Sequence, residues 1–273
     1  MTWGGWSIEP PLAYVAIAAL LYWVGGRGYR PGHGQPRRTA SFVAGLATIV
    51  LALESPLDGA ADQLFWAHML QHVLLLTVAP PLILLGRPWP RMWRALPLGS
   101  RTAIGRTLAR ARWTGPLRAL ARPFPACLLF NATIVGWHIP GAYEATLTSN
   151  TIHQVEHAMF FFTGLLFWAR VIDPGPLRPR LVWPARIAYV VGAMVVGWVL
   201  AITLVLVPEP VYSHYALLTH RPGGISALTD QQLAGGVMWV PGSLAYGVAM
   251  LIGVYRWLEP ESGARPPAPA LTT

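Results

Sequence analysis

Apolar residues fill long blocks of this chain, and short polar or arginine-rich segments separate the blocks. A helix of about 20 apolar residues is long enough to cross the hydrocarbon core of a bilayer. We therefore expect an all-α membrane protein, a bundle of seven transmembrane helices that forms a single domain over residues 1–258. The expected spans cover residues 11–25, 39–54, 61–86, 124–139, 150–170, 184–207 and 230–258.

The composition agrees with a polytopic membrane protein. Hydrophobic residues make up 54% of the 273 residues and charged residues only 11%, whereas soluble domains carry about 25% charged residues. Pro80 and Pro81 lie near the end of the third expected span, where they should kink the helix or free backbone groups. Residues 259–273 have the composition of a disordered cytoplasmic tail. Cys127 is the single cysteine, so no disulfide framework is expected.

The basic residues are all arginines, and they gather in alternate connecting segments. With the spans above, Arg221 alone of the 20 basic residues would lie on the opposite side from the others. Because cytoplasmic loops carry the arginine excess, we expect the N-terminus outside and the C-terminus in the cytoplasm. Arginines between apolar spans indicate contact with anionic lipid headgroups rather than with nucleic acid.

Two pairs of histidines lie within the expected spans, in "WAHMLQH" and in "HQVEH". His68 and His72 would lie about 10 and 16 Å below the outer end of the third span, and His153 and His157 about 5 and 10 Å below that of the fifth. Side chains four residues apart share one face of a helix. Histidine inside a membrane marks a functional site or an interhelical hydrogen bond. Two pairs at similar depth predict a metal site.

Imidazole ligands suit copper, zinc or iron, and nearby thioethers favour Cu(I). We expect His72 and His157, the deepest pair, to be the core ligands, with His68 and His153 completing the site. A carboxylate can accept the far ring N–H of a ligating histidine. The candidates for further ligands or for such supporting contacts are Met69, Met159, Met238, Asp62, Glu156, His138 and Gln231.

Other chemistries fit parts of this pattern. The segment "HQVEH" matches the HxxEH pattern of zinc proteases, although no soluble catalytic domain surrounds it. Paired histidines on two helices can also ligate a haem, as in a membrane electron carrier. A third alternative is a metal-free scaffold whose histidines hydrogen-bond across helices.

Three blocks of the chain, residues 54–86, 136–168 and 228–242, resemble the CtaG family of caa(3)-type cytochrome c oxidase assembly proteins. They contain "WAHMLQH", "GWHIPGAYEATLTSNTIHQVEH" and "LTDQQLAGGVMWVPG", in this order. The resemblance points to Asp58, Asp62, His68, Met69, Gln71, His72, Trp137, His138, His153, Glu156, His157, Asp230, Gln231, Gln232 and Met238.

The resemblance implies a seven-span protein of the bacterial inner (plasma) membrane that is not an enzyme. It implies a role in supplying copper to a maturing oxidase, with oxidase subunits and periplasmic copper carriers as partners. We expect copper, as Cu(I), to be the bound metal, with haem and zinc as alternatives.

Overall fold

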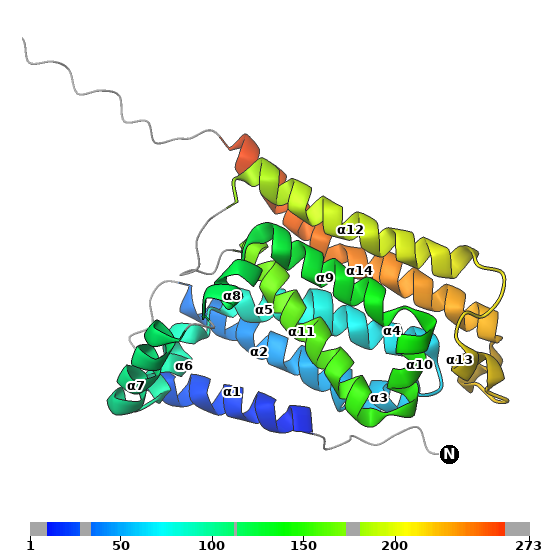
Figure 1. The fold of residues 1–273 in the computed structure, drawn as a ribbon, viewed down its shortest axis with the longest axis horizontal. Coiled ribbons are helices and arrows are strands. Elements are labelled where there is room, and N and C mark those ends of the chain that lie inside the picture. The colour runs from blue at the N-terminus through cyan, green and yellow to red at the C-terminus, as the bar shows by residue number, and fades with distance from the viewer. Residues whose placement is uncertain (1–9, 28–33, 112–113, 173–180, 260–273) are drawn as a thin grey trace, which may run out of the picture.

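The computed structural model describes residues 10–27, 34–111, 114–172 and 181–259, and these residues form helices and connecting segments without any strand (Figure 1). Residues 260–273, where we expect the tail, lie outside the described residues. The longer helices are α1 (Pro10–Gly26), α2 (Gln35–Leu53), α4 (Phe65–Val73), α5 (Ala79–Gly86), α7 (Leu98–Arg110), α9 (Pro123–Trp137), α10 (Pro140–Thr148), α11 (Asn150–Ile172), α12 (Trp183–Leu206) and α14 (Ala227–Leu258). The shorter ones are α3 (Pro56–Ala61), α6 (Trp89–Ala95), α8 (Thr114–Leu120), α13 (Ser213–Leu217), the π-helix η1 (Leu74–Val78) and the 3₁₀ turn η2 (Pro222–Gly224).

A helix occupies most of each of the seven expected ranges, but they differ in their ability to cross a membrane. Four helical segments are long and apolar enough: the continuous run Phe65–Gly86, α11, α12 and α14. The pair α8 and α9, bent by 77°, makes a fifth if it is counted as one span. The 17-residue α1 is apolar but shorter. The described residues thus define an all-helical, multi-pass membrane protein.

The long helices pack side by side in one bundle (Figure 1). α12 packs along α14, α2 along α5, and α1 against α2 and α6, while α4 contacts α3 and α14. Several large apolar side chains on the outside of the bundle face away from it. Phe124, Leu206 and Leu251 are 76%, 73% and 73% exposed. In water this would be a large apolar surface, whereas a membrane protein presents such side chains to lipid.

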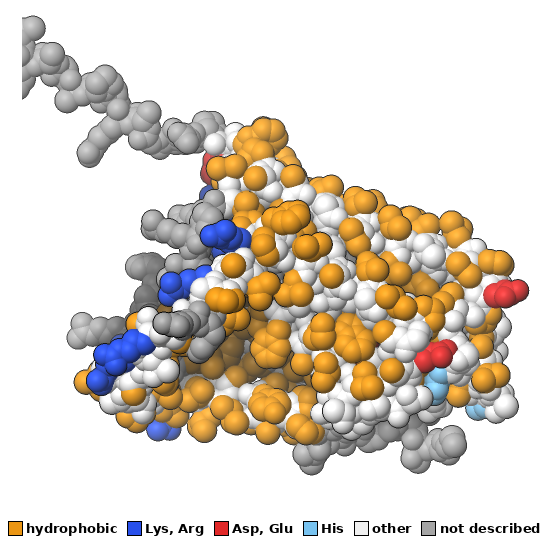
Figure 2. Space-filling model, viewed as in Figure 1, with side chains coloured by type: hydrophobic (Ala, Val, Ile, Leu, Met, Phe, Trp, Pro, Cys, Tyr) orange, Lys and Arg blue, Asp and Glu red, His pale blue; other side chains and the backbone are white. Residues whose placement is uncertain are grey.

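The two ends of the bundle differ in charge. On the face in Figure 2, arginines gather at the end where α6 and α7 lie, and acidic and histidine side chains appear at the opposite end. Hydrophobic side chains cover most of the surface between the two ends. This distribution agrees with the alternation of arginine-rich segments in the sequence.

The third expected span contains a π-helical segment, η1, directly before Pro80 and Pro81. Since proline has no N–H, Pro80 cannot donate to the carbonyl of Leu76 four residues earlier. The indole nitrogen of Trp168 on α11 donates to this carbonyl oxygen at 3.0 Å. The run Phe65–Gly86 stays helical through the two prolines. The freed carbonyl joins this run to α11.

The backbones of these two segments approach closely at Gly164 of α11. A Cβ atom at Gly164 would lie 2.9 Å from the Leu76 carbonyl oxygen and 3.0 Å from Cγ of Pro80. Glycine therefore allows α11 to lie directly against the π-helical segment.

We expect Trp168→Phe to lower the free energy of unfolding by about 1–3 kcal/mol through the loss of the hydrogen bond to a buried carbonyl, in addition to the effect of the smaller ring. Trp137→Phe is a matched control, because the buried indole nitrogen of Trp137 makes no hydrogen bond among the described residues. Thermal unfolding in detergent micelles measures both. Equal destabilisation by the two substitutions would contradict a stabilising role for the Leu76–Trp168 contact.

Candidate metal centre

Two contacts from other helices fix the position of α4 and thus of its histidines. The carboxylate of Asp230, in the first turn of α14, accepts hydrogen bonds from the backbone N–H groups of Phe65 and Trp66 at 2.9 and 3.0 Å. It therefore satisfies donors at the N-terminus of α4 that have no partner within the helix. Gln71 donates to the carbonyl of Ala52 at 2.7 Å and to Asp58 at 2.9 Å, which ties α4 to α2 and α3.

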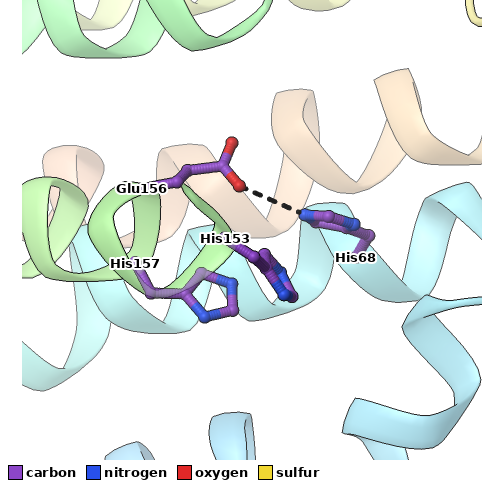
Figure 3. Close-up of side chains that lie close together, drawn as sticks. All are labelled: His68, His153, Glu156 and His157. Carbon is purple, nitrogen blue, oxygen red and sulfur yellow. Dashed lines mark ion pairs between the residues drawn. The ribbon is translucent and has the colours of Figure 1, made fainter. Parts of the chain in front are cut away.

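The histidines of α4 and α11 meet in the interior of the bundle. Four side chains converge there, each with one potential ligand atom, and these atoms all lie within 4.8 Å of one another (Figure 3). We call this set the His/Glu cluster; it consists of His68, His153, Glu156 and His157. Glu156 is completely buried, His68 and His157 are buried and His153 is half-buried.

Most of the polar atoms in the cluster have no hydrogen-bond partner among the described residues. This holds for Nε2 of His68, His153 and His157 and for both carboxylate oxygens of Glu156. Both ring nitrogens of the neighbouring His72 are in the same situation. Buried polar atoms are almost always hydrogen-bonded, and a buried carboxylate is costly unless it is paired or coordinates a metal. A bound cation would satisfy Nε2 of the three cluster histidines and the Glu156 carboxylate together.

The Glu156 carboxylate lies between the two histidines of α4. Its Oε2 is 3.7 Å from Nε2 of His68 and 3.6 Å from Nε2 of His72. These separations are too long for hydrogen bonds. They are close to the roughly 3.4 Å that separates two ligand atoms of a tetrahedral ion with bonds of about 2.1 Å.

The hydroxyl group of Tyr215 sets the tautomer of His68. This hydroxyl donates its proton to the Ala61 carbonyl at 2.7 Å, and its oxygen lies 3.2 Å from Nδ1 of His68. The oxygen can therefore only accept at this contact, so Nδ1 of His68 carries the proton. The lone pair is then on Nε2, the atom that faces Glu156. Supporting contacts of this kind commonly orient the histidines of metal sites.

Three imidazoles and one carboxylate form a complete ligand set for a first-row metal ion. The surroundings are crowded with aromatic rings: the ring of His72 packs against Phe160 at a centroid distance of 4.4 Å, and His68 against His153 at 5.0 Å. The cavity beside His72 has a volume of about 50 Å³. Pockets for organic cofactors occupy about 300 Å³ or more. The cavity beside His72 is therefore too small for a haem.

The structure brings together most of the site residues predicted from the sequence. His68, His153 and His157 converge with Glu156, which faces His68 and His72 directly rather than supporting a ligand from behind. His72, which we expect from the sequence to be a core ligand, lies beside this set of four, with its Nε2 3.6 Å from Oε2 of Glu156. Met69 and His138 lie side by side next to this set, and Met238 lines the same cavity.

Three predicted residues take other roles. Gln231 uses its side chain to bind the backbone of Leu204, Glu209 and Val211, so it holds the outer loop rather than a metal. Met159 is 37% exposed on the outside of α11. The sequence predicts that Asp62 could accept the far ring N–H of a ligating histidine, but Tyr215 supports His68 instead, and the Asp62 carbonyl lies 3.4 Å from Nε2 of His214. These positions depend on helix rotation and on loop contacts, which spacing does not reveal.

The sequence does not indicate the structural role of Tyr215 and the tyrosines beside it. Tyr143, Tyr212 and Tyr215 form a buried aromatic group with Phe65, between the His/Glu cluster and the outer loop. Tyr215 lies in the short helix α13 and Tyr212 directly before it, and nothing in the spacing of this segment indicates that it folds back over α4.

The helices and the buried cluster together define a multi-pass membrane protein with a candidate metal centre. A comparison with known protein families identifies this class more closely. Residues 18–259 match the family described as cytochrome c oxidase caa3 assembly factor (Caa3_CtaG). The chain belongs to this family.

Similar proteins occur in mycobacteria. An uncharacterised protein of Mycobacterium bovis and one of Mycobacterium tuberculosis are each 27% identical over 237 residues, which cover 84% of this chain and 35% of the relative. An uncharacterised protein of Mycobacterium leprae is 23% identical over 263 residues, 92% of this chain and 39% of the relative. The chain therefore spans little more than a third of the length of these relatives. No solved structure matches the chain.

We expect Tyr215→Phe to weaken metal binding at the His/Glu cluster by about 10–100-fold, because His68 loses the partner that fixes its tautomer. Titration of the purified protein with Zn²⁺, a redox-inert probe for imidazole sites, measures the change. Tyr22→Phe is the matched control: Tyr22 is equally buried and its hydroxyl lies 2.9 Å from Thr39 Oγ1, far from the cluster. Unchanged affinity in Tyr215→Phe would contradict this assignment of the tautomer.

Proposed function

We propose that this protein binds copper at the His/Glu cluster and delivers it to cytochrome c oxidase during assembly. The observation that carries the proposal is the convergence of three histidines and a glutamate from α4 and α11 whose ligand atoms lie within 4.8 Å of one another. Membership of the oxidase assembly family supplies the acceptor, since haem–copper oxidases must receive copper as they mature. Imidazole nitrogens bind copper in both oxidation states.

The proposed orientation has seven crossings, with the N-terminus outside and the C-terminus in the cytoplasm of a bacterial inner membrane. It is supported by the separation of arginines from acidic and histidine side chains at the two ends of the bundle (Figure 2). In this orientation the cluster lies in the outer half of the membrane, near α3, α10 and α13. The arginines of α6 and α7 then face the anionic lipids of the inner leaflet.

Delivery requires that the ion can leave as well as bind. His153 is half-buried, whereas the other three members of the cluster are buried. It is therefore the member through which a partner protein would gain access from the outer side. His68, Glu156 and His157 would hold the ion away from water, where carboxylate and imidazoles attract it most strongly. Ligand exchange from His153 to a histidine or methionine of the acceptor would transfer copper by the exchange of coordination bonds alone. Periplasmic copper carriers would load the site by the same route.

Two alternatives make different predictions. A zinc-binding protein would use the same ligand set but retain zinc on purification. A metal-free scaffold would keep its histidines for contacts between helices, yet the unpartnered ring nitrogens at the cluster give such contacts little support. A haem protein would show a Soret band. The small cavity beside His72 argues against a haem there.

We expect His157→Gln and His153→Gln to remove the copper bound at the His/Glu cluster of the purified protein and to lower the copper content of cytochrome c oxidase in the same cells, because each removes one of three imidazoles. His214→Gln is the matched control, since His214 lies at the outer surface on α13 rather than in the cluster. Elemental analysis of the assembly factor and of the isolated oxidase provides both measurements.

The outcome against the proposal is also defined. Full copper in the oxidase of cells that carry either cluster variant would contradict delivery through this site. If the purified wild-type protein contained zinc instead of copper, the proposed site would stand but the proposed cargo would be zinc.

A further inference from the structure

A second pair of potential ligands lies beside the His/Glu cluster, where α4 meets the end of α9. Met69 of α4 is completely buried, and its Sδ is 3.3 Å from Nε2 of His138, a residue that is also buried. Nδ1 of His138 is 2.7 Å from the carbonyl oxygen of Ile134. A carbonyl oxygen can only accept, so Nδ1 carries the proton and the neutral ring has its lone pair on Nε2. Two lone-pair atoms thus face each other in the interior of the bundle.

Such a contact offers no hydrogen bond, because a thioether has no proton to donate. It becomes favourable when a cation accepts electron density from both atoms. A small cavity adjoins the pair, with a volume of about 50 Å³ and with Met69, His72, His138 and Met238 among the residues that line it. This space admits an ion but no organic ligand. Met238 adds a second sulfur to its wall, from α14.

We propose that Met69 and His138, together with Met238, form a second metal site that is selective for Cu(I). Thioether sulfur is a soft ligand that favours Cu(I), whereas zinc and other harder ions bind better to the imidazoles and carboxylate of the His/Glu cluster. The identity of the cargo rests on the proposed function, but the site itself rests on the residues around the cavity. The two sites together would give the protein a means of excluding zinc.

His72 connects the two sites. Its ring lines the cavity of the soft site, its Nε2 lies 3.6 Å from Glu156 in the His/Glu cluster, and its ring centroid is 6.3 Å from that of His138 and 5.5 Å from that of His157. Both of its ring nitrogens lack a hydrogen-bond partner among the described residues. His72 can therefore turn its ligand atoms to either site, and we infer that copper passes between the sites by way of this residue.

The test is Cu(I) binding by the full-length protein in detergent, without oxygen and against a Cu(I) chelator, combined with X-ray absorption at the copper edge. We expect two Cu(I) per wild-type chain and sulfur among the copper ligands. Met69→Leu, which conserves side-chain volume, should hold one Cu(I) and lose the sulfur signal. His138→Gln should do the same. Met159→Leu is the matched control, because the Met159 side chain lies on the outside of α11, and it should behave as wild type.

A variant of the other site separates this inference from the proposed function. His157→Gln should also hold one Cu(I), but with the sulfur signal intact. If His157→Gln retains both ions while Met69→Leu loses one, the soft site stands and the His/Glu cluster fails as the copper site. The inference is overturned if the wild-type protein shows no sulfur ligand, if Met69→Leu retains both ions, or if either substitution removes all copper, since that would indicate a single joint site.

Discussion

The completely buried carboxylate of Glu156 is the constraint on which the rest of this structure depends. An unpaired carboxylate inside an apolar bundle is strongly unfavourable, and here two imidazoles of α4 approach one of its oxygens without making hydrogen bonds to it. The surrounding helices hold this arrangement in place from several sides. The Asp230 carboxylate caps α4, Tyr215 fixes one imidazole, and Trp168 joins α11 to the carbonyl that Pro80 leaves free. A bound cation would resolve the polar conflict at Glu156.

The same contacts explain why α4 and α11 can meet at this depth. Small residues and proline allow the approach on the side of the π-helical segment, where Gly164 leaves no side chain between the backbones. The side chains of the His/Glu cluster lie on other stretches of α4 and α11. The close backbone contact and the candidate metal centre therefore occupy different stretches of the same two segments. The loop that covers the centre is held separately, by Gln231 and by the contact of Ser213 with Glu144.

Much of this arrangement could be predicted from the sequence, and the reason is periodicity. The spacing of His68 and His72, and of His153 and His157, places each pair on one face of its helix, and a shared depth follows from the positions of the apolar blocks. The rotation of each helix about its axis does not follow from spacing. The sequence therefore could not show that Met69 faces His138, that Met159 faces outward or that Gln231 binds backbone carbonyls. Tyr215 lies in the short helix α13, where no periodic pattern indicates which helix a side chain will contact.

The proposed role depends on where copper binds, and anomalous scattering at the copper edge from crystals of the copper-loaded protein locates it most directly. The prediction is a peak within bonding distance of His68, His153 and His157 and of the Glu156 carboxylate. Copper found only at surface histidines such as His214, with no peak inside the bundle, would contradict a copper centre between α4 and α11.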